Sequence, residues 1–310
     1  MNKKTCLVTG GSGFIGGFIV EELLSHGHKV ISYDCEESHT AKLDIIFIKG
    51  DLREKTKLEK CLKGVDEVYH CAAILGTEEL FDTPQEALEV NLIGLLNLLE
   101  ASVKAKVHNF FYPSSPYVWR NIYSFTKHAG EELCLVYNRA YNLNTKILRL
   151  WNIYGPRQSI FPIRKAVPIF VLQALLDEPI EIFGNGKSNI RLIYVHDLAK
   201  IIVKFMSQEK VHKLPLDIDT GDNSIMTVED LANKIICLTK SKSTIIHIPK
   251  RFGEFDNLKL KRLKNVVDVF EENQIFTSID EGLLATIEYY KKLPDNDKLD
   301  IILKFKNNNK

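Results

Sequence analysis

The sequence has no excess of charge of either sign. Its 310 residues carry 41 lysines and arginines against 40 aspartates and glutamates, which leaves a net charge of +1. That balance gives no sign of the basic surface that binds nucleic acids or anionic membranes. No apolar run approaches the roughly 20 residues that cross a bilayer, and glycines interrupt the apolar stretch that would make the N-terminus a signal peptide. We expect a soluble, cytoplasmic protein without a nucleic-acid or membrane partner.

Cysteine is scarce and scattered. The chain has six cysteines and no C-x-x-C pair, which is the spacing of many zinc and dithiol sites. Cys6 and Cys71 lie in apolar runs typical of buried strands, so we interpret the cysteines as small core side chains of a reducing compartment. The histidines are equally dispersed, and we expect His70 only to satisfy backbone groups. No metal site is predicted.

The first half of the chain alternates apolar runs with amphipathic segments. We predict strands at 5–9, 28–34, 45–50, 66–73, 109–115 and 145–151, and helices at 14–27, 54–63, 84–103 and 122–141. Near-continuous apolar strands separated by helices are typical of a parallel sheet covered on both faces. Right-handed crossovers then predict an α/β fold with a Rossmann-type, doubly wound sheet.

The pattern changes after residue 151, where prolines become frequent and the elements look shorter and less regular. We therefore expect a smaller, mainly C-terminal α+β lobe that covers the substrate. The predicted domains are a dinucleotide-binding domain at 1–153, to which the chain returns around 190–212, and a substrate lobe over most of 154–310.

A glycine-rich loop joins the first predicted strand to the first helix. In TGGSGFIG (9–16), Gly10 permits a tight turn, Gly13 lets backbone approach a pyrophosphate, and Gly16 allows the helix to pack closely on the strand. The helix N-terminus adds free N–H groups and a positive dipole end. A structural turn is the alternative, but the position between strand and helix favours a dinucleotide site.

Asp34 ends the second predicted strand, 18 residues after Gly16. A carboxylate near this spacing binds the adenosine ribose hydroxyls in dinucleotide folds. It would repel a 2′-phosphate, so we predict NAD rather than NADP as the cofactor. The alternative is that Asp34 only caps the turn after its strand.

Several motifs occur in the order typical of one family: TGGSGFIG (9–16), GDLRE (50–54), HCAA (70–73), VNLIGLLNLLEA (90–101), RLWNIYGPRQ (149–158), RLIYVHDLA (191–199) and TGDNSIMTVEDLA (220–232). Over nearly its whole length the chain resembles the extended short-chain dehydrogenase/reductases, and within them the NAD-dependent epimerase/dehydratase branch that acts on nucleotide sugars. The resemblance to UDP-glucose 4-epimerases implies a homodimer formed through the helices at 84–103 and 122–141. It also implies cofactor contacts by Phe14, Ile15, Asp51, Leu52, Ala72 and Ala73.

Tyr123 and Lys127 lie four residues apart, hence on one face of a predicted helix. By resemblance Tyr123 is the catalytic base, and Lys127 tunes it and binds the nicotinamide ribose. Free tyrosine has a pKa near 10, so a value of about 7 requires a shift of ~3 units, or about 4 kcal/mol, from the ammonium and the positive nicotinamide ring. The alternative is a simple exposed helix contact.

Ser115 and Ser114 end the fifth predicted strand, where ligands of open α/β sheets bind. The resemblance places Ser115 in the catalytic position and Ser114 beside the substrate, whereas both serines could instead only turn the chain. The family normally has a longer segment before its catalytic tyrosine. Here only seven residues separate Ser115 from Tyr123; they span about 23 Å when extended, so the triad remains possible while the substrate becomes uncertain.

The residues that follow Ser115 favour one reaction over others. Dehydratases of this family carry an Asp-Glu pair there and decarboxylases a glutamate, whereas this chain has Pro116 and Tyr117. The sequence thus favours a redox-neutral epimerisation at sugar C4. A nucleotide-sugar dehydratase or keto-sugar reductase, and a non-catalytic NAD-responsive binding protein, are the alternatives.

A nucleotide-diphosphate sugar needs local positive charge, preferably from arginine. By resemblance Arg191 and Asn152 contact the substrate diphosphate. Arg251 and Glu254 match an Arg-x-Gly-Asp element that holds the nucleotide, with glutamate in place of the aspartate. Ordinary surface salt bridges are the alternative for both arginines.

Overall fold

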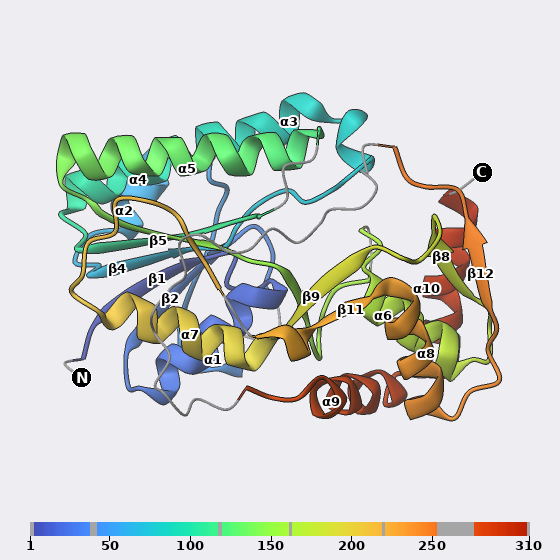
Figure 1. The fold of residues 1–310 in the computed structure, drawn as a ribbon. Coiled ribbons are helices and arrows are strands. Elements are labelled where there is room, and N and C mark those ends of the chain that lie inside the picture. Colours follow the sequence, from blue (N-terminus) through green and yellow to red (C-terminus); the bar gives the residue numbers. More distant parts are fainter. Residues whose placement is uncertain are drawn as a thin grey trace. The chain divides into compact units, whose positions relative to one another are not determined.

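The computed structural model of the protein describes residues 3–37, 42–116, 120–160, 163–218, 221–252 and 276–308 (Figure 1). These residues form two compact units, which we describe separately. The described residues up to Leu150 and from Leu198 to 218 make up the first unit. Those at 151–197, 221–252 and 276–308 make up the second.

The first unit is built on a seven-stranded sheet in the order β10-β6-β5-β4-β1-β2-β3, in which every neighbouring pair is parallel (Figure 1). Its strands are β1 (Thr5–Thr9), β2 (Lys29–Asp34), β3 (Ile46–Lys49), β4 (Glu67–His70), β5 (Asn109–Ser114), β6 (Asn144–Arg149) and β10 (Leu216–Asp217). The predicted doubly wound parallel sheet is confirmed.

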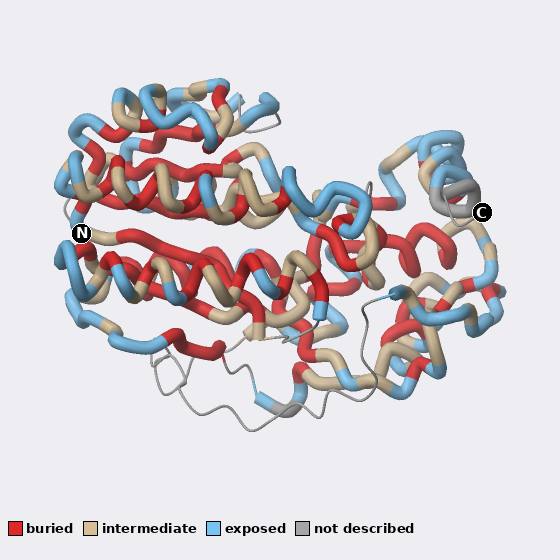
Figure 2. The backbone as a smooth tube through the Cα atoms, turned by 90° about the horizontal axis from the view of Figure 1, so that it is seen from above, coloured by how far each residue is buried: buried red, intermediate tan, exposed pale blue. Residues whose placement is uncertain are grey.

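Helices cover both faces of this sheet (Figure 1). One face carries α1 (Phe14–Ser25) and α7 (Val195–Ser207), and the other carries α2 (Lys55–Cys61), α4 (Gly94–Ala105) and α5 (Ile122–Tyr141). Figure 2 shows the strands as a buried layer between these helices, whose outward sides are exposed. Side chains such as Leu7, Val68 and Phe110 are fully buried in the resulting core, as the near-continuous apolar strands predict.

The helix predicted at 84–103 is present and contains a π-helical turn that the sequence did not predict. The segment consists of α3 (Pro84–Leu88), a π-helical turn at Glu89–Ile93 and then α4. Asn91 lies in the π turn with its side chain buried. Its Oδ1 accepts from the Ile74 backbone N–H at 2.8 Å and its Nδ2 donates to the Ile74 carbonyl at 2.9 Å. A π turn is a common way to aim one side chain at a specific partner.

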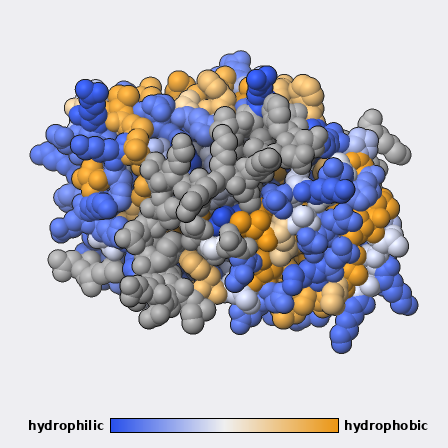
Figure 3. Space-filling model, viewed as in Figure 1, coloured by the Kyte–Doolittle hydropathy of each residue, from blue (hydrophilic) through white to orange (hydrophobic). Residues whose placement is uncertain are grey.

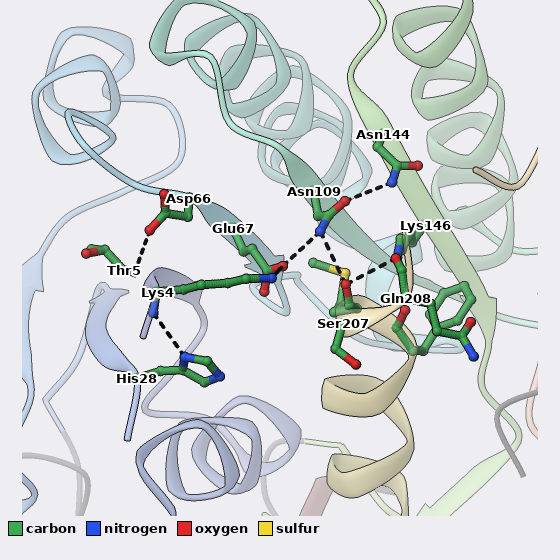
Figure 4. A network of polar contacts seen from close by, with 12 residues as sticks. Lys4, Thr5, His28, Asp66, Glu67, Asn109, Asn144, Lys146, Ser207 and Gln208 are labelled. Atoms are coloured by element: carbon green, nitrogen blue, oxygen red, sulfur yellow. Dashed lines mark hydrogen bonds and ion pairs between the residues drawn. The ribbon is translucent and has the colours of Figure 1, made fainter. Parts of the chain in front are cut away.

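The amino edge of the sheet holds a buried polar network (Figure 4). Lys146, on β6, is fully buried, and its Nζ donates to the carbonyls of Phe205 and Met206 at 3.0 and 3.2 Å and to that of Gln208. These carbonyls lie at the C-terminal end of α7, where helix carbonyls run out of intrahelical donors; that of Phe205 also accepts from the Gln208 N–H at 3.3 Å. Asn109 links the same helix end to Glu67, because its Nδ2 donates to Met206 O at 3.2 Å and to Glu67 Oε1 at 2.8 Å.

The second unit mixes short sheets and helices. β9 (Asn189–Tyr194) pairs with β7 (Asn152–Tyr154) and β11 (Ile225–Thr227), while β8 (Ile180–Phe183) pairs with β12 (Ile245–Ile248). Its helices are α6 (Ala166–Leu175), α8 (Val228–Thr239), α9 (Ile279–Lys291) and α10 (Asp295–Asn308). Capping boxes start α8 at Thr227 and α9 at Ser278, which satisfies free N–H groups at both helix ends. A short 3-10 helix at Asp222–Ser224 precedes β11.

All six cysteines are unpaired. Cys6 and Cys134 are buried, as expected of core residues, but Cys35 and Cys237 are exposed, so the core interpretation is wrong for these two. No helix among the described residues has the length and hydropathy needed to cross a membrane. The face drawn in Figure 3 mixes hydrophilic and hydrophobic side chains.

Candidate active site

The glycine-rich loop lies at the point where the strand order reverses. β1 has β2 on one side and β4 on the other, and ligands of doubly wound sheets bind at the carboxyl ends of two such strands. Gly10 follows β1 with a φ of +70°, and a Cβ there would lie 2.6 Å from the backbone nitrogen of Ala72. A Cβ on Gly16 would overlap the carbonyl oxygen of Gly10. Gly16 thus lets the first turn of α1 pack closely on the residues that directly follow β1.

The start of α1 fits a phosphate group. Gly13 is the N-cap residue in an extended conformation, and no side chain caps the helix. Its N–H donates to Gly10 O at 3.0 Å, while Phe14 and Ile15 begin the first turn half-buried. Uncapped N–H groups at a helix N-terminus are favourable to an anion.

Asp34 ends β2 and faces the same loop. Its Oδ2 accepts from the Ser12 N–H at 3.0 Å, and its Oδ1 accepts from the Glu36 N–H at 3.2 Å. The capping role that we weighed as the alternative therefore exists in the structure. The Cys35 thiol also donates to Oδ1 at 3.5 Å. A carboxylate has about four acceptor positions, so these three bonds leave room for a ribose hydroxyl, chiefly at Oδ2, and that role stays a prediction.

The other predicted cofactor residues surround the loop. Asp51 is bound by Arg53 through a fork, with Nε–Oδ1 and Nη2–Oδ2 distances of 3.0 and 2.7 Å, and these hydrogen bonds lower the pKa of Asp51. Leu52 is buried, and Ala72 and Ala73 follow β4 half-buried.

His70 ends β4 beside these alanines and does not bind backbone, contrary to the prediction. Its Nδ1 lies 2.8 Å from Thr9 Oγ1, and burial lowers the pKa of the imidazole to about 3. A neutral His70 thus joins the ends of β1 and β4, the two strands that flank the loop.

Tyr123 and Lys127 lie on the first two turns of α5. Asn121 caps the helix by accepting from the Ser124 N–H at 2.8 Å. The Lys127 Nζ lies 5.8 Å from the centre of the Tyr123 ring and donates to the Pro113 carbonyl at 2.8 Å. Pro113 belongs to β5, directly before Ser114 and Ser115, which are both buried. The lysine therefore joins the helix that carries the tyrosine to the strand end that carries the serines.

Burial shifts this pair away from its ionised forms. It raises the pKa of the half-buried Tyr123 phenol and lowers the pKa of the buried Lys127 ammonium to about 8. The chain alone does not produce the acidic phenol that base catalysis requires. Additional positive charge beside Tyr123 is needed, as we expected from the nicotinamide ring.

The predicted substrate residues Asn152, Arg191 and Arg251 belong to the second unit, and we describe their positions relative to one another. Asn152 and Arg191 lie on the neighbouring strands β7 and β9, with Asn152 Nδ2 donating to Arg191 O at 3.3 Å. The Arg191 side chain is buried over the Trp151 ring, 5.6 Å from its centre, and donates to Gly221 O at 3.4 Å. This burial does not fit the surface salt bridge that we weighed as the alternative. Arg251 is half-buried, and Glu254 lies outside the described residues.

The comparisons with known proteins show which family the chain belongs to. Residues 6–218 match the NAD dependent epimerase/dehydratase family. The chain belongs to this family. Since the family's cofactor is NAD, the cofactor prediction is confirmed, and the loop, helix start and Asp34 described above are the groups that fit it.

Three relatives illustrate the range of the family. A UDP-N-acetyl-alpha-D-glucosaminuronate decarboxylase of Bacillus cytotoxicus is 30% identical, covering 95% of this chain and 100% of the relative. The UDP-glucose 4-epimerase of Thermotoga maritima, solved with UDP-glucose, has a TM-score of 0.79 and 27% identity over 93% of this chain and 99% of its own. The UDP-glucuronic acid 4-epimerase of Bacillus cereus, solved with UDP-glucuronic acid and NAD, has a TM-score of 0.81 and 25% identity over 94% and 100%.

Two residues beside the site were missed from the sequence. Glu131 lies on α5 in one row with Tyr123 and Lys127, and Arg149 binds it with Nε–Oε1 and Nη2–Oε2 distances of 2.9 and 2.8 Å. Arg149 pairs with Ser114 across β6 and β5. Burial opposes ionisation of Glu131, but the two hydrogen bonds from Arg149, with His128 Nδ1 3.8 Å away, outweigh it and lower the pKa of Glu131 to about 2.

Asn91 was missed as well. Besides holding Ile74, its Nδ2 donates at 3.2 Å to Oγ1 of Thr126, the residue before Lys127. It thus joins the chain after β4 to the helix of the candidate base. The signal was available, because an asparagine inside an apolar helical segment normally has a specific partner.

Proposed function

We propose that the chain is an NAD-dependent nucleotide-sugar epimerase that acts at sugar C4. The observation that carries this proposal is the contact of Lys127 with the Pro113 carbonyl at 2.8 Å, which holds the Tyr123 helix against the strand end of Ser115. Base, cation and hydroxyl are the three groups that reversible oxidation of a secondary alcohol requires.

Each group has a definite task. Tyr123, as phenolate, removes the proton of the C4 hydroxyl and later returns it to the 4-keto sugar. Ser115 holds that hydroxyl, and Lys127 favours the phenolate through its charge. Bound NAD would supply the hydride acceptor for oxidation at C4 and the donor for return of the hydride to the opposite face of the 4-keto sugar, and its positive ring would offset the burial of Tyr123.

The substrate is proposed to be a nucleotide-diphosphate sugar, with UDP as the first nucleotide to test. The three relatives described above act on or bind UDP-sugars by their names. Arg191 and Asn152 are the residues that we expect at the diphosphate, with Arg251 and Glu254 at the nucleotide and Ser114 near the sugar. A buried arginine fork suits a phosphate group.

Decarboxylation is the second candidate, because the Bacillus cytotoxicus relative matches over its whole length. Pro116 argues against it, since decarboxylases of the family carry a glutamate after the serine. NMR of UDP-glucose and UDP-glucuronic acid incubated with the enzyme separates the two. A C4 epimer supports our proposal, and release of CO₂ with a pentose product overturns it. Consumption of added NADH would instead indicate a keto-sugar reductase.

The role of Tyr123 is tested by Tyr123→Phe. We expect turnover to fall at least 10³-fold while NAD released on denaturation stays at the wild-type level, because the phenylalanine keeps the shape and loses only the proton acceptor. Near-wild-type turnover in this variant would refute the assigned base. A protein that binds NAD but converts no sugar in any wild-type assay would support the non-catalytic alternative.

We also propose a homodimer through α4 and α5. Phe125 and Val136 lie about three turns apart on one face of α5, and their exposed fractions are 59% and 55%. Exposed large apolar side chains in a row are typical of an interface. Light scattering of the purified protein should give twice the monomer mass, and Phe125→Asp should give the monomer.

A further inference from the structure

Two arginines share one aromatic ring in the second unit. The guanidinium carbons of Arg164 and Arg251 lie 4.9 and 5.0 Å from the centre of the Phe183 ring. Phe183 ends β8, and β12 pairs with it at Ile248, three residues before Arg251. Guanidinium groups stack favourably on aromatic faces, so the ring holds both cations in place.

Arg164 is the buried member of this pair. Its side chain is 8% exposed, and its Nη2 lies 2.9 Å from Glu181 Oε2 and donates to Glu181 O at 3.3 Å. Its Nη1 is also buried and has no hydrogen-bond partner among the residues that the structure describes. A buried donor on a charged group is costly to leave unsatisfied, which makes this nitrogen unusual in a folded protein.

The two cations are held together against their repulsion. Arg251 donates from Nη1 to the backbone carbonyl of Arg164 at 3.5 Å. Burial lowers the pKa of Arg164, Glu181 raises it, and the charge of Arg251 lowers it further. An anion bound between two such groups would relieve the repulsion and give Nη1 its acceptor.

We propose that Arg164 completes a phosphate-binding subsite with Arg251, and that its ligand is the diphosphate of the substrate nucleotide. Phosphate oxygens accept from planar guanidinium forks in pairs. The inference rests on the proposed function and goes beyond it, because it assigns Arg164 a role that no motif of the sequence predicts. Phe183 then acts as the positioning residue for both arginines.

UDP titration of the full-length protein, followed by calorimetry, tests this subsite. Glu181→Gln removes the ion pair but keeps Arg164, so it is the matched control, and we expect its Kd for UDP within 3-fold of the wild type. Arg164→Gln combined with Glu181→Gln leaves no unpaired buried carboxylate, and we expect it to bind UDP at least 10-fold more weakly. Inorganic pyrophosphate should compete with UDP on the wild type and lose that ability on the double variant.

The kinetic readout separates a subsite from a structural ion pair. In the double variant the KM for the nucleotide sugar should rise with little change in kcat, and the Tm should be no lower than that of Glu181→Gln alone, because the single variant leaves the buried Arg164 charge without its partner. Equal UDP affinity in the double variant and its control would overturn the subsite while the proposed function stands. Equal losses in both variants would show a purely structural role. If the wild type binds no nucleoside diphosphate, both the subsite and the proposed function fail.

Discussion

Glu131→Gln removes one charge of the ion pair behind the candidate active site and keeps the shape of the side chain. In the structure Arg149 binds both carboxylate oxygens of Glu131, at 2.9 and 2.8 Å, and the Glu131 side chain is 4% exposed. Breaking a buried pair typically costs about 3–5 kcal/mol, and since the Arg149 side chain left behind is 30% exposed we expect the lower end of that range. We expect a large loss of stability from a change of a single atom.

The pKa of Glu131 gives a second value for the contribution of this carboxylate to the free energy of unfolding. The folded state lowers it from 4.5 to about 2, and each unit corresponds to about 1.4 kcal/mol, so the carboxylate stabilises the fold by about 3 kcal/mol at neutral pH. The folded pKa lies below the unfolded one. This contribution is therefore complete above pH 4.5 and is lost as the pH falls through 2.

Urea denaturation of the wild type and Glu131→Gln at two pH values measures the contribution of the Glu131 carboxylate to stability. We expect the difference in unfolding free energy between wild type and Glu131→Gln to be about 3 kcal/mol at pH 7 and to shrink by about 1.4 kcal/mol at pH 3.5. Glu132→Gln is the matched control, because Glu132 is the neighbouring exposed residue of α5; it should change stability by less than about 0.5 kcal/mol.

Two results would refute this reasoning. If Glu131→Gln matched Glu132→Gln at pH 7, the pair would contribute nothing measurable to the fold. If the difference from wild type were large but independent of pH, its cause would be packing rather than the ionised carboxylate.

Three further predictions concern the loop, the lysine and the thiols. Lys127→Met should abolish turnover and raise the unfolding free energy by about 1–3 kcal/mol at pH 7, measured by urea denaturation. Burial lowers the pKa of Lys127 to about 8, so the buried ammonium destabilises the wild-type fold. This destabilisation is complete below pH 8 and disappears as the pH rises toward 10.5, so the gain in stability from the substitution should disappear over the same range. Gly16→Ala should abolish NAD retention, measured as nucleotide released on denaturation, because its Cβ would overlap the loop's own carbonyl. In the native protein a thiol reagent should label the exposed Cys35 and Cys237 quickly, and Cys134, buried and with a raised pKa, only after unfolding.

Much of the first unit was predictable because its elements are specified locally. Buried parallel strands need continuous apolar runs, and helices between them need an apolar face, so periodicity alone predicts their order. Gly10 was predictable as well, because the tight turn after β1 requires a positive φ, here +70°, which glycine adopts without strain. Tyr123 and Lys127 were found because their spacing of four is itself the geometry of one helix face.

Contacts between distant segments were not predictable in this way. Arg149 lies 18 residues from Glu131, and the packing of α5 on β6 brings them together. The row of Tyr123, Lys127 and Glu131 was nonetheless readable, since residues at i, i+4 and i+8 share a face. Arg164 had no such signal, because nothing in its neighbourhood in the sequence indicates Phe183 or Glu181.

The two buried lysines of the first unit show why burial alone does not identify a functional residue. Lys127 and Lys146 are both buried and both have a pKa lowered to about 8 by burial. Lys146 lies at the amino edge of the sheet, where three carbonyls at the end of α7 accept hydrogen bonds from its Nζ. These bonds engage all three N–H donors of the ammonium. Lys127 has one carbonyl partner and two tyrosine rings nearby. It lies beside the carboxyl edge, where ligands of such sheets bind. The remaining donors of Lys127 are therefore the ones that can serve a cofactor and a phenolate, and the number of carbonyls around each ammonium distinguishes the structural lysine from the catalytic candidate.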